Sequence, residues 1–207
     1  MVDFALLNQI SELEKQMSTC QSCDLFRGRK QVVFGSGKKY KPKIMIIGEA
    51  PGQEEDEQGV PFIGKAGQKL DSILKYVGVS REDVYITNAV LCRPPSNRPP
   101  RREELDSCKW RLDLQIKLLQ PKILIVLGRT AYEQLNGGPL KGALSQVFPK
   151  NPDQPGGSWR TYTVGDLSTK VMVSYHPSYI LRSPESGYKQ TLPHWRMIKI
   201  WLEQNKK

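Results

Sequence analysis

Hydrophobic residues recur along this chain at spacings that predict helices alternating with strands. A first helix is expected near the amino end, because apolar residues follow a helical period at Leu6, Leu7, Ile10, Leu13 and Met17. Continuous apolar runs predict strands buried on both faces at 44–47, 84–90, 123–127 and 171–173. Further helices are expected at 70–77, at 105–119, in a short segment opening at 128–130, and at about 193–204. Residues 136–170 are rich in Gly, Pro and polar side chains, which predicts a loop with room for one hairpin.

This order of elements predicts an α/β fold, a three-layer sandwich in which helices flank a central, mostly parallel four-stranded sheet. We expect one domain over 1–207, because the chain is long enough for one such core and short for two. Ligands of these sheets bind beyond the carboxyl ends of the strands. Those ends carry Glu49, Asn88, Arg129 and His176. A carboxylate, an amide, a guanidinium and an imidazole are therefore expected to face one crevice.

The charge balance favours a polyanionic partner. Lys and Arg number 31 against 21 Asp and Glu, a formal net charge of +10. Nucleic acid is the commonest such partner, and a basic surface that only aids solubility is the alternative. No apolar run approaches the roughly 20 residues that a membrane-spanning helix needs. The amino end carries Asp3 where a secretory signal would carry positive charge, so we expect a cytoplasmic protein.

The four cysteines are candidate metal ligands. Cys20 and Cys23 form a C-x-x-C pair, whereas Cys92 and Cys108 lie far downstream and far from each other. Four cysteines in a cytoplasmic chain bind metal more often than they form disulfides, although intracellular disulfides occur in hyperthermophiles. An iron–sulfur cubane takes four thiolates at scattered spacing, while structural zinc sites usually use two tight pairs. The spacing alone leaves a cluster, zinc and disulfides or free thiols open.

Four sequence motifs carry a resemblance to a known family. They are GEAPG at 48–52, GVPFIGKAG at 59–67, YITN at 85–88 leading into CRPP at 92–95, and HPSYILR at 176–182. Together with the cysteine pattern, the chain resembles the family 4 uracil-DNA glycosylases, the iron–sulfur type of archaea and thermophilic bacteria. The resemblance covers 15–202 in the right order, and only 136–170 matches no family signature. It implies one uracil-DNA glycosylase domain and a 4Fe–4S cluster on Cys20, Cys23, Cys92 and Cys108.

The resemblance also implies a reaction. Such an enzyme flips uracil out of DNA, hydrolyses its N-glycosidic bond with an activated water, releases free uracil and leaves an abasic site, as base excision repair of deaminated cytosine requires. Phe62 would stack on the flipped ring, and Asn88 would read the uracil N3–H and O4. His176 would lie against O2 and stabilise the negative charge that develops on the departing base. No lysine stands in a nucleophile motif, so we expect a monofunctional glycosylase.

The residue that positions the water is left open. Either Glu49 or Glu55 could hold the water and stabilise positive charge on the sugar, and Glu55 could instead lie near C5 and exclude the methyl group of thymine. Other glycosylase families often carry Asp or Asn at the position of Ala50, which here cannot activate water. Gly48, Glu49 and Ala50 are expected to complete the uracil pocket.

Basic and proline-rich segments are the expected DNA contacts. Candidate residues are Lys65, Arg93, Arg98, Leu181 and Arg182. Leu181 could fill the space that the flipped base vacates, as apolar wedges do in DNA-bending proteins. Lys65 begins a helix and Arg182 lies in the expected loop 178–184, so both are phosphate candidates. We expect uracil-containing DNA as the partner of a monomer, with no membrane contact and no motif for a sliding clamp.

Two alternatives remain beside the enzyme. A related branch binds uracil-DNA covalently through a histidine in a basic insertion, but 98–102 contains no histidine. A non-catalytic iron–sulfur or zinc module that binds nucleic acid could keep the same fold. The presence of Glu49, Phe62, Asn88 and His176 argues against such a module.

Overall fold

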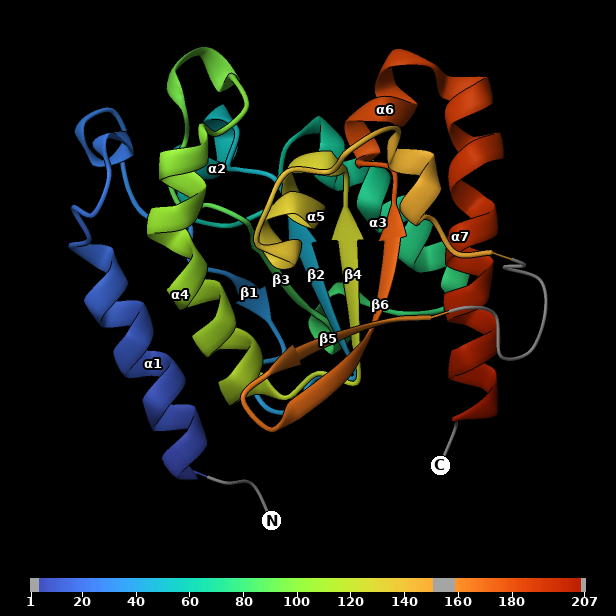
Figure 1. The fold of residues 1–207 in the computed structure, drawn as a ribbon, viewed down its shortest axis with the longest axis horizontal. Helices are drawn as coiled ribbons and strands as arrows, with labels where there is room; N and C mark the ends of the chain where they lie inside the picture. The colour runs from blue at the N-terminus through green and yellow to red at the C-terminus, as the bar shows by residue number, and fades with distance from the viewer. Residues whose placement is uncertain (1–3, 151–158, 206–207) are drawn as a thin grey trace.

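The computed structural model describes residues 4–150 and 159–205. A six-stranded sheet runs through the molecule in the order β1-β3-β2-β4-β6-β5 (Figure 1). The strands are β1 (Ser36–Gly37), β2 (Ile44–Gly48), β3 (Tyr85–Asn88), β4 (Ile123–Leu127), β5 (Arg160–Val164) and β6 (Leu167–Ser174). The four inner strands pair in parallel, while β1 and β5 run antiparallel at the two edges. The predicted α/β sheet, mostly parallel, is therefore confirmed.

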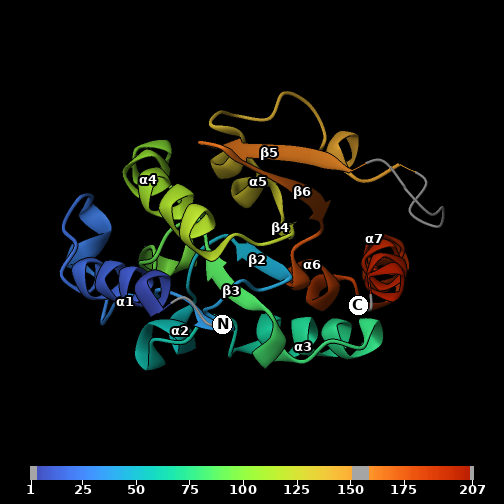
Figure 2. The same ribbon diagram turned by 90° about the horizontal axis from the view of Figure 1, so that it is seen from below.

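Helices cover both faces of the sheet, so the three layers are present (Figure 2). The helices are α1 (Phe4–Ser18), α2 (Gln53–Gln58), α3 (Lys65–Val77), α4 (Arg102–Leu119), α5 (Arg129–Asn136), α6 (Pro177–Arg182) and α7 (Pro184–Gln204). Side chains of α1, α4 and α5 pack into one core, and side chains of α3, α6 and α7 pack into the other. Short 3-10 turns lie at Asp24–Arg27, Arg81–Asp83, Pro95–Asn97 and Leu144–Val147.

The continuous apolar runs are explained by burial on both faces. In β2, Met45 and Ile47 pack into the core under α1 and α4, while Ile44 and Ile46 pack into the core under α3 and α7. Successive side chains of a strand point to opposite faces, so a strand covered on both sides needs apolar residues at every position. All four predicted strands are found for this reason.

The strand count was predicted too low, because two edge strands escaped the analysis. β1 has only two residues, and β5 alternates exposed with half-buried positions. The hairpin allowed for within 136–170 is present as β5 and β6, but β6 extends beyond 170 and includes the strand predicted at 171–173. Residues 151–158 of that segment lie outside the described residues. The last helix begins at Pro184 rather than near 193. Pro193 lies inside α7, although proline usually marks a helix start.

Two further helices were missing from the sequence analysis. The acidic segment that forms α2 was not among the predicted helices, and the residues of α6 were expected to form a loop. Asp3, on which the interpretation of the amino end rests, lies outside the described residues. Within the described part of the chain, no helix combines the length and the apolarity needed to cross a membrane.

Candidate active site

A cleft of about 750 Å³ opens at the carboxyl ends of the parallel strands. The strands β2, β4 and β6 point toward this edge, where α2, α5 and α6 follow them (Figure 1). The predicted residues that line the cleft are Glu49, Ala50, Glu55, Phe62, Lys65, Asn88, Arg98, Arg129, His176 and Arg182. Those that do not line it are Gly48, Arg93 and Leu181. The structure therefore brings the four strand-end groups together in one crevice.

Asn88 is a buried amide with an unused acceptor. It is the last residue of β3, and its side chain is only 1 % exposed although it lines the cleft. Its Oδ1 has no hydrogen-bond partner among the described residues. A buried polar atom without a partner costs about 1–3 kcal/mol, so the arrangement suits a ligand that supplies the missing donor. Gly48 pairs with Asn88 in the sheet, and a side chain on Gly48 would collide with Asn88 Oδ1 and the Phe62 ring.

Phe62 and His176 both line the cleft, and their rings are neighbours. The two ring centroids are 5.6 Å apart and the planes are tilted by 34°. The backbone of Phe62 adopts a positive φ of 56°, which is uncommon for a bulky residue. Its ring is 5 % exposed and packs with the core beside α3, so it serves the core as well as the cleft.

His176 is held in one orientation at the start of α6. The backbone N–H of Ser178 donates to His176 Nδ1 at 3.2 Å, and the Ser178 hydroxyl lies 2.9 Å from the same atom. Burial, with a smaller effect of Arg182, lowers the pKa of His176 to about 4. The imidazole is therefore neutral at pH 7. Since Nδ1 accepts a hydrogen bond, the ring proton is assigned to Nε2.

The two candidate carboxylates differ in their surroundings. Glu49 is half-buried, and one oxygen accepts a 2.6 Å hydrogen bond from the Thr130 hydroxyl at the start of α5. Glu55 is 9 % exposed and accepts hydrogen bonds from the backbone N–H groups of Gly52, Ile63 and Gly64 at 2.9–3.0 Å. The carboxylate of Glu55 thus ties α2 to the turn that carries Phe62.

The basic residues also differ in how free their charges are. Arg98 forms a two-pronged ion pair with Glu104, at 2.5 and 2.8 Å, which neutralises its guanidinium. Arg93 is not part of the cleft lining, but its Nε donates at 2.7 Å to Oδ1 of Asn97, which is. Lys65, the first residue of α3, and Arg182, the last of α6, both border the cleft.

Sequence analysis missed several residues of the cleft. Tyr175 and Tyr179 stack with centroids 4.5 Å apart and both line it. Tyr179 belongs to the HPSYILR motif and Tyr175 directly precedes that motif, so attention to aromatic residues there would have found them. Thr130 carried no such signal, because its contact with Glu49 joins positions 81 residues apart.

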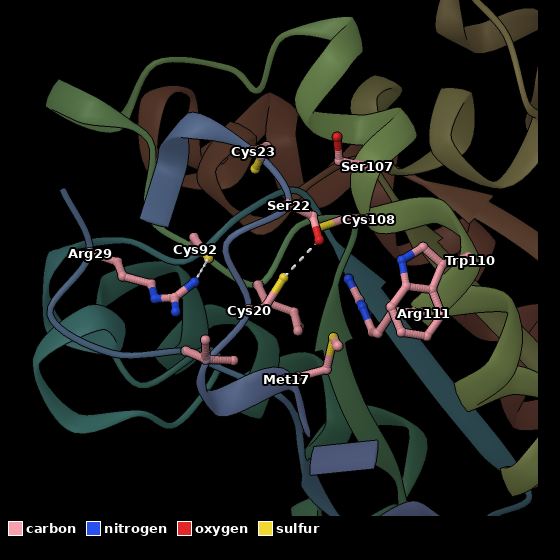
Figure 3. Close-up of a pocket in the computed structure, with 12 residues that line it drawn as sticks. Met17, Cys20, Ser22, Cys23, Arg29, Cys92, Ser107, Cys108, Trp110 and Arg111 are labelled. Carbon is pink, nitrogen blue, oxygen red and sulfur yellow. Dashed lines mark hydrogen bonds between the residues drawn. The ribbon is translucent and has the colours of Figure 1, made fainter. Parts of the chain in front are cut away.

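A second pocket gathers all four cysteines (Figure 3). They come from the segment after α1, from the loop after β3 and from α4, and all four are free thiols. Arg29 Nη1 donates to Cys92 Sγ at 3.1 Å. Burial is the main reason why the pKa of Cys92 is raised to about 11 and that of Cys23 is raised. Among the described residues, no group of three or more His, Cys, Asp or Glu side chains is arranged to hold one metal ion.

Comparisons with known proteins agree with this fold and cleft. The sequence model of the uracil DNA glycosylase superfamily matches residues 34–203. The type-4 uracil-DNA glycosylase of Pyrobaculum aerophilum is 40% identical over 178 residues, which cover 84% of this chain and 86% of that protein. The type-4 uracil-DNA glycosylase of Thermotoga maritima is 39% identical over 178 residues, covering 86% and 84%. A type-5 uracil-DNA glycosylase of P. aerophilum is 30% identical over 151 residues, covering 66% and 61%.

This match shows that the chain, with its α/β sandwich, belongs to the uracil DNA glycosylase superfamily. With relatives at this identity over most of its length, the chain belongs to the type-4 uracil-DNA glycosylases.

Proposed function

We propose that this chain is a monofunctional glycosylase that removes uracil from DNA. The flipped base enters the strand-end cleft, water cleaves the bond between C1′ and N1, and free uracil and an abasic site result. Relatives that share most of the chain are named for this activity. The observation that carries the proposal is the buried amide of Asn88, whose unpartnered oxygen lines the cleft.

Asn88 supplies the pattern that uracil needs. Its amide offers one acceptor and two donors, which complement the N3–H donor and the O4 acceptor of uracil. Cytosine presents the opposite pattern on the same edge, so an amide fixed in one orientation rejects it. Phe62 supplies an aromatic face for the flipped uracil ring. Gly48, which has no side chain, leaves room for the Phe62 ring and the Asn88 amide.

His176 stabilises the leaving group as a neutral donor. When the C1′–N1 bond breaks, its electron pair stays on uracil, and the charge spreads from N1 to O2. The N–H of Nε2, aimed at O2, stabilises that charge more in the transition state than in the ground state. The low pKa of His176 is consistent with this role, because the donor needs no extra proton at neutral pH.

Glu49 is the better candidate to position the water. Its carboxylate borders the cleft and is oriented by Thr130, which leaves the group able to accept a proton from water attacking C1′. The carboxylate oxygens of Glu55 already accept hydrogen bonds from three backbone N–H groups. We therefore assign Glu55 the role of holding the turn that carries Phe62. The choice that the sequence left open thus falls on Glu49.

DNA contacts are proposed around the rim of the cleft. We infer that Lys65 and Arg182, which line the cleft, contact phosphates, and that Leu181, 38 % exposed on α6, fills the gap left by the base. The ion pair with Glu104 makes Arg98 a weaker phosphate ligand and gives it a part in fixing the proline-rich loop. Arg93 remains a candidate outside the cleft lining.

The four-cysteine pocket is proposed to hold a 4Fe–4S cluster. Four free thiols from three separate segments face one pocket, and soft thiolates suit iron–sulfur clusters. When bound, the cluster would tie α1 to α4 and to the loop after β3. We propose that residues 1–207 form one glycosylase domain, because both cores share a single sheet.

The proposal is tested with a labelled duplex that contains a single uracil. Release of free uracil with turnover, and alkali-sensitive abasic sites, would support the enzyme. A protein–DNA adduct that survives alkali would point to the covalent relative instead. Retarded duplex without any product would point to a binding module and overturn the proposal. A duplex with thymine in place of uracil is the matched control.

A further inference from the structure

Arg111 is a buried cation between the two sites. It lies on α4, one turn after Cys108, and it is 1 % exposed. Its side chain lines the four-cysteine pocket, where Figure 3 shows it near Cys108 and Trp110. Burial of a guanidinium is costly unless its charge is compensated and its N–H groups are bonded.

One side of the guanidinium grips the end of β3. Arg111 Nη2 donates to the backbone carbonyls of Asn88 at 3.1 Å and Ala89 at 2.9 Å. Nη1 donates to Gln115 Oε1 at 2.6 Å, and Gln115 Nε2 donates to the Tyr85 hydroxyl at 3.0 Å. Arg111 and Gln115 therefore hold the last and the first residue of β3 from the same helix.

The backbone segment that Arg111 holds is also bonded to the end of β2, next to Glu49, the proposed water-positioning carboxylate. The N–H of Ala89 donates to the carbonyl of Gly48 at 2.9 Å, and the N–H of Val90 donates to the carbonyl of Glu49 at 3.3 Å. A shift of the 88–90 backbone would therefore move both the edge-reading amide and the strand end that carries Glu49. Geometric errors near 1 Å at a reacting site can cost about a hundredfold in rate.

The other side of the guanidinium faces the thiols. Burial lowers the pKa of Arg111, and negative charge on Cys108, Tyr85 or Cys92 would raise it again. Its Nε has no hydrogen-bond partner among the described residues. Thiolates that hold a cluster carry the negative charge that this buried cation needs, whereas neutral thiols do not.

We propose that Arg111 is a positioning residue that couples the four-cysteine pocket to the alignment of Asn88. Thiolates in the pocket compensate its charge, and its two-carbonyl grip fixes the peptide that carries the edge-reading amide. The inference rests on the proposed function, because it requires Asn88 to read uracil.

The test compares Arg111→Met, Arg111→Lys and the control Lys117→Met, which removes an exposed charge from the same helix. Iron content and the rate of iron release to a chelator are measured first, and single-turnover uracil excision is then measured per bound cluster. We expect Arg111→Met to release iron at least about tenfold faster and to excise uracil at least about tenfold more slowly. Arg111→Lys keeps the charge but loses the planar fork, so iron release should stay near wild type while excision still falls.

The other outcomes of this test distinguish a failure of the inference from a failure of the proposed function. Binding of an undamaged duplex should be unchanged in both variants, since Arg111 is buried away from DNA. Wild-type excision per cluster in Arg111→Met would overturn the inference while leaving the proposed function intact. Unaltered iron release in that variant would remove the link to the pocket and overturn it as well. Absence of uracil excision by the wild-type protein would refute the proposed function itself.

Discussion

Replacement of Asn88 by alanine is the sharpest perturbation of the proposed uracil pocket. The structure predicts a large loss of excision with little loss of stability. Asn88 Oδ1 has no partner among the described residues, so truncation removes no native hydrogen bond through that oxygen. The backbone carbonyl that Arg111 holds is unaffected by the change. We therefore expect the melting temperature to fall by no more than a few degrees, roughly the effect of a small cavity.

The loss of excision follows from the two edge contacts. Each buried uracil group left without its partner costs about 1–3 kcal/mol, so the two together cost about 2–6 kcal/mol. This corresponds to a decrease in kcat/KM of between roughly 30-fold and roughly 25,000-fold. The measurement is single-turnover cleavage of an end-labelled duplex with one uracil, after alkali treatment.

Two controls make the Asn88→Ala result decisive. Asn136→Ala removes an exposed amide at the end of α5, outside the cleft lining, and should leave excision unchanged. Binding of an undamaged duplex should also be unchanged in Asn88→Ala, because the amide meets only a flipped base. An equal loss of excision and of undamaged-duplex binding would refute the edge-reading role, as would wild-type excision.

Three further predictions concern the imidazole, the two carboxylates and the cysteines. The pKa of His176 is about 4 against 6.5 for an exposed imidazole, so the unfolded chain is protonated first as the pH falls. Its contribution to the free energy of unfolding is complete above pH 6.5 and is lost toward pH 4, which urea unfolding of wild type and His176→Gln would show as a difference in slope. Glu49→Gln should slow excision at least roughly tenfold at unchanged melting temperature, whereas Glu55→Gln should lower the unfolding free energy by roughly 1–3 kcal/mol, and the reverse pattern would exchange their roles. Cys108→Ser should give colourless, poorly folded protein, and a brown, stable variant would remove Cys108 from the ligand set.

The parts of the fold that the sequence predicted well are those that burial dictates. Strands covered on both faces must be apolar at every position, so β2 and β4 stand out without any other information. The strand-end rule then placed Glu49, Asn88 and His176 at one edge, because each ends a parallel strand or lies within two residues of its end. Neither step needs knowledge of side-chain contacts.

The features that the sequence did not predict depend on contacts between residues far apart in the chain. The acidic helix α2 is fixed where Glu55 accepts N–H groups from the turn after Phe62, and its local sequence resembles a solvated turn. The sequence does not distinguish a free arginine from a paired one, so the ion pair between Arg98 and Glu104 could not be predicted. Arg111 had no signal at all, since its carbonyl partners lie more than 20 residues away.

The shape of the proposed uracil pocket depends on glycines, which leave space, as much as on the side chains around it. Gly48 leaves room for the amide and the ring, and Gly67 allows the backbone carbonyl of Phe62 to approach α3 closely. That approach holds Phe62 in its positive-φ conformation, which costs about 1–3 kcal/mol in isolation. The bonds from Ile63 and Gly64 to Glu55 help to offset this cost. Glycines and a buried carboxylate therefore decide where the Phe62 ring lies, and the motif GVPFIGKAG contains most of the residues that set this geometry.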